Sequence, residues 1–181
     1  MKTFRNIHIY LSLFFLPLAL MYALTGILYI SGIDQNYGAT KNTYTMHNAT
    51  KGKEIESMLK YFKENNIALP KVGEIKEKEG KLIVGSAHYS ATLEKKAEDS
   101  YNITTIERSF IGNLIMLHKA KAKWYFDVLA IGFGITMFLL YFSGVMITLV
   151  NIKKNREKQI LTIIAGIVIS TIVGGLSVLI A

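Results

Sequence analysis

Several residue types and motifs are absent from this chain, and each absence excludes a class of chemistry. None of its 181 residues is cysteine, so the chain has no thiol chemistry and no disulfide, and a folded domain must be held by its apolar core. The sequence has no Gly-rich phosphate loop, no Gly-x-Ser-x-Gly elbow and no His-Glu-x-x-His motif. Hydrolase and nucleotide chemistry therefore have no support in the sequence.

Charged side chains are missing from three long runs. Residues 7–30 and 160–181 contain no Asp, Glu, Lys or Arg, and residues 124–150 contain only Asp127, near the start of the run. At about 1.5 Å rise per residue, a helix of any of these lengths crosses a hydrocarbon core of about 30 Å. The first run is too long for a cleaved signal peptide. The sequence therefore predicts three transmembrane helices, the first an uncleaved anchor.

Basic residues beside these runs predict the orientation. Lys2 and Arg5 precede the first run, and the short segment 151–159 carries Lys153, Lys154, Arg156 and Lys158 against one acidic residue. Because short cytoplasmic segments are enriched in Lys and Arg, we expect the N-terminus and residues 151–159 to be cytoplasmic and residues 32–123 to lie outside. The basic excess is then expected to meet anionic membrane lipid, and nucleic acid is a poor fit.

The segment between the first two runs has the pattern of a small α+β domain. Residues 52–66 place Ile55, Met58, Leu59 and Phe62 at helical spacing, which predicts one amphipathic helix. Turn residues separate four short runs that predict an antiparallel sheet, at residues 72–78, 81–86, 89–95 and 101–108. One helix on one face of such a sheet forms a two-layer unit.

Together these features predict an α-helical membrane protein with three transmembrane helices and a small extracytoplasmic α+β domain. The polar segment 34–50 is expected to be an extended connector. The predicted organisation is a first span at 1–31, the outer domain at 32–123, a second span at 124–150, a cytoplasmic loop at 151–159 and a third span at 160–181.

Two of the four histidines lie beside the predicted spans. His8 is near the cytoplasmic end of the first span, and His118 precedes the outer end of the second. Because the two spans run antiparallel, His8 is expected to lie at about the same depth as Ser143, Gly144 and Met146. His118 is expected to lie on the outer side of Thr25 and Gly26. Two interpretations stay open: small residues and interfacial histidines that serve helix packing, or space for the edge of a flat cofactor held by the imidazoles.

Other polar residues have simpler interpretations. His47 and His88 belong to the outer domain and lack the clustered spacing of a metal site, so a surface role is expected. Asp127 is expected to pair with Lys121 or Lys123, and a proton-relay role is the alternative.

Residues around the two histidines resemble the PepSY-associated transmembrane helix family. The resemblance rests on Arg5-Asn6-Ile7-His8 and Ala23-Leu24-Thr25-Gly26 in the first span, and on Leu117-His118-Lys119 and Ser143-Gly144 around the second. It covers both spans, and the helix-then-strands pattern of residues 52–108 is compatible with a PepSY fold between them.

The resemblance implies a protein of the bacterial inner membrane, with residues 32–123 in the periplasm, linked to iron or siderophore uptake. Some members resemble b-type haem reductases that deliver electrons to extracytoplasmic ferric complexes. Carried over to this chain, the resemblance makes His8 a haem ligand on the cytoplasmic side and His118 one on the outer side. A bis-histidine site would then need a second copy of the chain or a partner membrane subunit, because this chain has one candidate per membrane face. Methionine is the alternative axial ligand. Met146 is expected at about the right depth for His8, whereas Met116 is two residues from His118, a spacing that does not place both side chains on opposite faces of one haem.

Two functions from different classes follow from this. The chain is either a haem-dependent electron-transfer component of the ferric reductase type, which forms a homo-oligomer or joins a partner membrane subunit, or a non-enzymatic anchored module that binds a partner or a peptide. Because no flavin or nicotinamide signature is present, a reductase would need an upstream electron donor.

Overall fold

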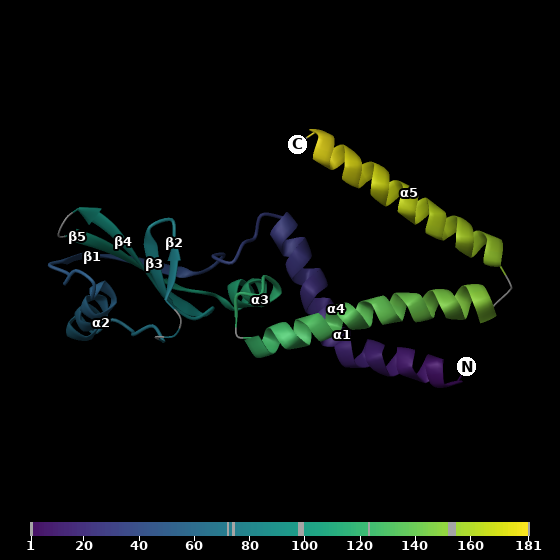
Figure 1. The fold of residues 1–181 in the computed structure, drawn as a ribbon, viewed down its shortest axis with the longest axis horizontal. Coiled ribbons are helices and arrows are strands. Elements are labelled where there is room, and N and C mark those ends of the chain that lie inside the picture. The colour runs from purple at the N-terminus through teal and green to yellow at the C-terminus, as the bar shows by residue number, and fades with distance from the viewer. Residues whose placement is uncertain are drawn as a thin grey trace. The chain divides into compact units, whose positions relative to one another are not determined.

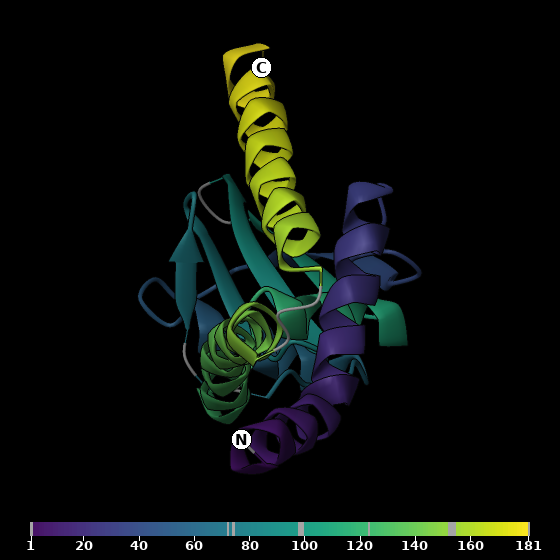
Figure 2. The ribbon, with the colours of Figure 1, turned by 90° about the vertical axis from the view of Figure 1, so that its right-hand side faces the viewer.

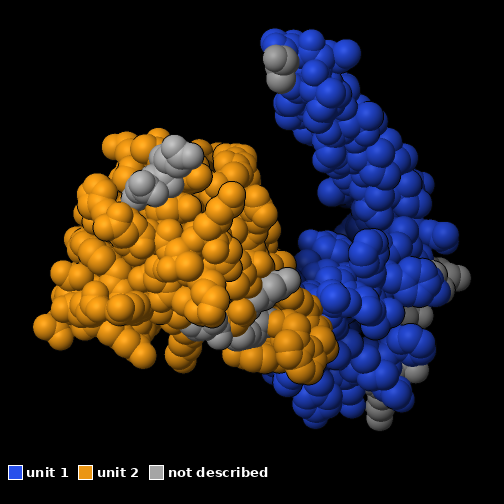
Figure 3. Space-filling view, turned by 60° about the vertical axis from the view of Figure 1, so that its left-hand side comes forward, with its two compact units in different colours: residues 1–17, 130–181 blue, residues 18–129 orange. Residues whose placement is uncertain are grey.

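The computed structural model describes residues 2–71, 73, 75–97, 100–122, 124–151 and 155–180, with the backbone alone for residues 2, 150 and 151. The chain forms two compact units, residues 1–17 with 130–181 and residues 18–129 (Figure 3). Five residues used in the sequence predictions lie outside the described ranges. They are the first residue of the first predicted strand, a possible partner of Asp127, two basic residues of the predicted cytoplasmic loop and the last residue of the third predicted span: Val72, Lys123, Lys153, Lys154 and Ala181.

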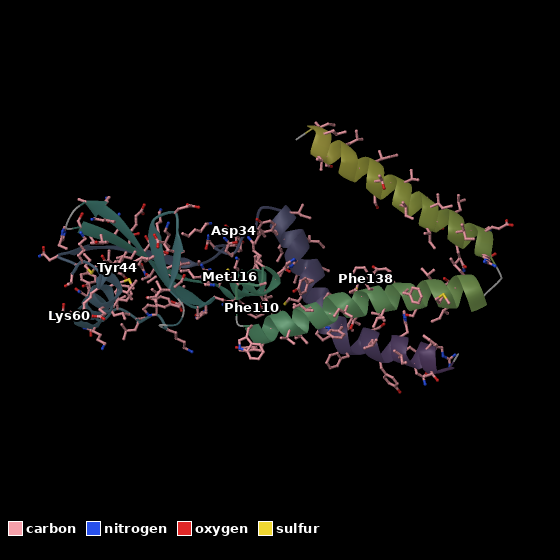
Figure 4. The ribbon with its side chains drawn as sticks, in the orientation of Figure 1. Asp34, Tyr44, Lys60, Phe110, Met116 and Phe138 are labelled. Atoms are coloured by element: carbon pink, nitrogen blue, oxygen red, sulfur yellow. The ribbon has the colours of Figure 1, made fainter. Side chains whose placement is uncertain are left out.

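Three helices are long and apolar enough to cross a membrane, as the sequence predicts. They are α1 (Lys2–Ile30), α4 (Trp124–Val145), which continues into a π-helix, η1 (Met146–Asn151), and α5 (Arg156–Ile180). Figure 2 shows α5 as one unbroken helix, and none of its side chains is buried. Large apolar side chains project outward from these helices, such as Phe138 of α4, which is 81% exposed (Figure 4). Helices that are apolar on all sides are expected to lie in lipid or against other helices.

The second unit contains a five-stranded antiparallel sheet with one helix on one face (Figure 1). The strand order is β1-β5-β4-β3-β2, with β1 at Thr40–His47, β2 at Lys76–Lys78, β3 at Lys81–Gly85, β4 at Tyr89–Ala97 and β5 at Ser100–Glu107. The covering helix is α2 (Glu54–Glu64), and its Met58 and Phe62 are fully buried. The predicted amphipathic helix and its two-layer packing are therefore confirmed.

The core between α2 and the sheet is apolar and continuous. Tyr44 points from β1 toward α2, where its ring centroid lies 6.3 Å from that of Phe62 (Figure 4). The buried cluster consists of Met46, Met58, Phe62, Val84, Ala91, Leu93, Tyr101 and Ile103. Because strand side chains alternate between faces, the residues between these positions lie on the sheet face that α2 does not cover.

The prediction of a connector over residues 34–50 is wrong for its second half. Residues Thr40–His47 form β1, an edge strand that pairs with β5 from Thr40 opposite Glu107 to His47 opposite Ser100. Of its eight side chains only Met46 is buried. A strand this polar has almost no alternation of apolar and polar residues, so its sequence does not indicate a strand. Its hydrogen-bonded pairing with β5 holds it in the extended conformation. The first predicted strand is also shorter than expected, since β2 covers only Lys76–Lys78.

A short helix, α3 (Phe110–His118), follows β5 and was not predicted. Its N-cap is Ser109, whose hydroxyl accepts a hydrogen bond from the Gly112 amide at 3.1 Å. A Cβ atom at Gly112 would lie 2.5 Å from the carbonyl oxygen of Gln35, so only glycine allows this close approach. His118 is the last residue of α3.

Candidate functional site

The structure brings His8 into direct contact with the hydroxyl-glycine pair that the sequence predicts for it. The Nδ1 atom of His8, on α1, lies 2.8 Å from the hydroxyl of Ser143, on α4. A Cβ atom built on Gly144 would lie 4.0 Å from His8 Cε1, so the glycine adjoins the edge of the imidazole ring. The expected match in depth between His8 and Ser143 is confirmed, and the contact between them lies wholly within the unit formed by residues 1–17 and 130–181.

The hydrogen bonds of Ser143 assign the proton of His8 to one ring nitrogen when the Ser143 hydroxyl donates to Leu140. The Ser143 hydroxyl lies 3.0 Å from the Leu140 carbonyl oxygen and donates its hydrogen there. A hydroxyl has one hydrogen, so toward His8 the Ser143 oxygen accepts a hydrogen bond, and the donor is the Nδ1–H of His8. In neutral imidazole the other nitrogen then carries a lone pair. In this tautomer the Nε2 lone pair of His8, which has no hydrogen-bond partner among the described residues, is available to a metal ion.

His118 repeats this arrangement within residues 18–129. Its Nδ1 atom lies 2.6 Å from the hydroxyl of Thr25, which donates to the Met21 carbonyl oxygen at 2.6 Å. Thr25 is only 2% exposed, and its neighbour Gly26 adjoins the imidazole, with a Cβ position 3.9 Å from His118 Cε1. The same reasoning assigns the hydrogen to Nδ1 and a lone pair to Nε2 of His118.

An aromatic ring adds a second contact at His118. The Tyr22 ring, one turn before Thr25 on α1, lies 4.5 Å from the imidazole, centroid to centroid, at an interplanar angle of 37°. The ring contact and the hydrogen bond together restrict the rotation of the His118 side chain. Each imidazole is thus oriented by a hydroxyl that itself donates a hydrogen bond to a carbonyl oxygen of its own helix. The sequence did not indicate this hydrogen bond from the hydroxyl to the helix.

A groove of about 540 Å³ adjoins His8, within the volume range of about 300–1,000 Å³ that small-ligand sites occupy. Its walls come from α1, α4, η1 and α5, so all three predicted spans contribute. The lining residues are His8, Ser12, Met137, Leu140, Tyr141, Gly144, Val145, Thr148, Gln159, Thr162 and Ile163. Met137 lines the groove, whereas Met146, the methionine considered from the sequence as a partner for His8, does not. The participation of α5 was not predicted.

The other histidines lie in exposed positions of the outer domain. His88 Nδ1 accepts a hydrogen bond from the Asn113 side-chain amide at 3.0 Å, and its Nε2 lies 3.6 Å from a Glu107 carboxylate oxygen. His47 ends the edge strand β1 and is exposed. Among the described residues, no three His, Cys, Asp or Glu side chains gather where they could hold a metal ion. This finding concerns sites in which protein side chains alone hold a metal ion. It does not concern a site in which one imidazole binds the metal of a cofactor.

Asp127 does not form the ion pair expected with Lys121. Its Oδ1 atom is buried and has no hydrogen-bond partner within the described part of the chain, and Lys121 is exposed. The alternative partner, Lys123, lies outside the described residues. Asp127 occupies the first turn of α4, where the positive end of the helix dipole stabilises an acidic side chain.

No profile of a known protein family, no curated protein and no solved structure matches the chain. The functional conclusion therefore depends on the residues and their geometry.

Proposed function

We propose that this chain is a membrane-spanning electron-transfer protein that holds haem b through His8 on the cytoplasmic side and His118 on the outer side. The observation that carries the proposal is the state of the two imidazoles. Each Nδ1–H donates to a hydroxyl that is itself bound to a helix carbonyl oxygen, so each Nε2 lone pair is available. Imidazole is a common axial ligand of haem iron, and a hydrogen bond to the second ring nitrogen orients such a ligand.

The residues around the His8 imidazole leave room for a flat cofactor. Gly144 and Gly26 adjoin the rings of His8 and His118 without a side chain, and at His8 a groove lined mostly by apolar side chains lies beside the ring. When bound, haem iron supplies one-electron transfer between its ferrous and ferric states. The chain provides the axial nitrogens, and the hydroxyls of Ser143 and Thr25 hold those nitrogens in place.

Each site contributes one imidazole, so a second protein ligand to the iron would have to come from a second copy of the chain or from a partner membrane subunit. The three apolar helices support membrane insertion, and the basic residues at Lys2, Arg5 and the segment 151–159 support a cytoplasmic N-terminus. In the bacterial inner membrane, which the family resemblance implies, the domain of residues 32–123 would face the periplasm. The proposed acceptor is ferric iron or a ferric siderophore, which takes up one electron to give the ferrous state.

The test is the visible spectrum of the full chain, expressed with a haem supply and purified in detergent. We expect a reduced b-type band, and we expect His8→Ala and His118→Ala each to lose about half of the haem while the double variant loses all of it. His47→Ala and His88→Ala are matched controls, because they remove imidazoles from exposed positions, and they should keep full haem content. A wild-type protein without the band refutes the proposal.

One observation favours a second candidate, a module that binds a partner protein. The sheet face opposite α2 presents threonine side chains in register on three neighbouring strands, Thr43, Thr104 and Thr92. They alternate with the core residues Tyr44, Ile103 and Leu93 and so face away from α2. A protein that retains its fold and binds no haem would favour this candidate.

A further inference from the structure

Most polar groups that line the His8 groove have already used their hydrogens. The Ser12 hydroxyl donates to the His8 carbonyl oxygen at 2.7 Å, the Thr148 hydroxyl to Gly144 at 2.9 Å and the Thr162 hydroxyl to Lys158 at 2.8 Å. These hydroxyls can therefore only accept hydrogen bonds from a ligand. A bound group with carboxylates, which also only accept, needs donors from elsewhere in the lining.

Gln159 is the lining residue that has a buried polar group left over. Its Oε1 atom is buried and has no hydrogen-bond partner among the described residues, and leaving a buried polar atom unpaired costs free energy. Rotation of the side-chain amide by half a turn exchanges its oxygen for the two Nε2–H donors without changing its shape. Gln159 can thus present two donors to the groove, whereas Tyr141, the other uncommitted donor in the lining, is 71% exposed.

The position of Gln159 also fits an anionic group. It lies at the start of α5, three residues after Arg156 and next to Lys158, and both of these side chains are exposed. Arg156 and Lys158 outnumber the one acidic residue of this turn, Glu157, so this end of the third span carries a net positive charge that attracts carboxylates. The two propionate groups of haem are carboxylates on one edge of an otherwise apolar ring, which matches a groove whose lining combines the apolar side chains of Met137, Leu140, Val145 and Ile163 with the Gln159 amide.

We propose that Gln159 is a positioning residue of the inner site, whose amide binds a propionate carboxylate of the haem held by His8. This inference rests on the proposed function, and it gives the third span a role: α5 completes the cytoplasmic cofactor site. The sequence alone left the purpose of this span open.

The experiment uses the full chain in detergent with three substitutions, Gln159→Leu, Gln159→Glu and Gln159→Lys, each in the wild-type and in a His118→Ala background that retains only the inner site. Ser177→Ala, on the same helix and outside the groove, is the control. Two quantities are measured: the rate at which haem transfers to an excess of a haem-scavenging protein, and the midpoint potential of the haem.

We expect Gln159→Leu to release haem about tenfold faster, because one hydrogen bond to a charged group is lost. Gln159→Glu should release it faster still and lower the midpoint potential, because a second negative charge repels the carboxylate and favours the ferric state. Gln159→Lys should keep release near the wild-type rate and raise the potential. A role in folding alone would not give opposite shifts for opposite charges.

Two results overturn the inference in distinguishable ways. If wild-type protein carries haem and all three Gln159 variants match it in release and potential, Gln159 does not contact the haem while the proposed function stands. Shifts of the same sign for Gln159→Glu and Gln159→Lys lead to the same conclusion. If wild-type protein carries no haem, the inference and the proposed function fail together.

Discussion

Replacing Thr25 with valine should release His118 from its fixed orientation while keeping the shape of the side chain. Valine has the branched shape of threonine but no hydroxyl, so the Nδ1–H of His118 loses the acceptor that lies 2.6 Å away. Thr25 is 2% exposed, so water cannot readily replace that acceptor. The Met21 carbonyl oxygen, which receives the Thr25 hydrogen, also loses a hydrogen bond but remains an α-helical acceptor.

The size of the effect follows from this geometry. A buried donor without a partner costs about 1–3 kcal/mol, and loss of the hydrogen bond behind a metal ligand typically weakens metal binding about 10- to 100-fold. We expect Thr25→Val to lower the free energy of unfolding by about 1–3 kcal/mol and to speed haem loss from the outer site about 10- to 100-fold. Thr25→Ser keeps the hydroxyl and should preserve most of both quantities.

The assay pairs thermal unfolding in detergent with transfer of haem to a scavenging protein, for wild type and both Thr25 variants. His8→Ala protein, which retains only the outer site, isolates the signal from His118. If Thr25→Val remains folded and releases haem at the wild-type rate, the hydroxyl does not orient the ligand, and the reasoning from tautomer to ligand is refuted.

Three further predictions concern the outer domain. Met58→Ala removes a fully buried side chain and should lower the free energy of unfolding by about 2–5 kcal/mol, measured by thermal unfolding. Gly85→Ala should destabilise the β3–β4 turn, because φ is +129° and a Cβ atom would lie 2.4 Å from the Tyr89 carbonyl oxygen; an unchanged melting temperature would contradict this. The carboxylate of Glu54 accepts hydrogen bonds from the backbone amides of Gly52 and of Glu54 itself, and these lower the pKa of Glu54. Its stabilisation is therefore present above the ordinary glutamate pKa of about 4.3 and is lost as pH falls through the lower folded value, so Glu54→Gln should reduce the dependence of stability on acid, measured as melting temperature against pH.

The features that the sequence predicted correctly are those with a strong local pattern. The long uncharged runs predicted α1, α4 and α5, and the apolar stripe with Met58 and Phe62 predicted α2. β1 was missed because only Met46 of its eight side chains is buried and only Tyr44 packs beside it against the core, so its conformation comes from pairing with β5. A strand of this kind is visible only when its neighbour is known.

The candidate site was predicted in its first contacts and missed beyond them. Antiparallel spans were enough to place His8 near Ser143 and His118 near Thr25, because depth along one helix fixes depth along the other. The direction of each hydrogen bond between hydroxyl and imidazole depends on which carbonyl oxygen lies within reach of the hydroxyl. The sequence does not show this, because it depends on the side-chain conformation. Gln159 was missed because a groove formed by three helices depends on their packing, and no local pattern in α5 encodes it. The PepSY-like nature of the outer domain stays a prediction.

The pairing of β1 with β5 has a mechanical consequence. Thr40, which begins β1, lies opposite Glu107, which ends β5, and paired strands are about 4.8 Å apart. The segment that leads back to α1 and the segment that leads onward to α3 and α4 therefore leave the sheet side by side. Because the paired strands hold these two segments together, they raise the effective concentration of α1 and α4 for each other. A force that pulls apart the segments before Thr40 and after Glu107 would separate the two strands from Thr40 onward, one residue pair at a time. Weakening this pairing should therefore loosen the contact of His118 with Thr25, which lies in the same unit.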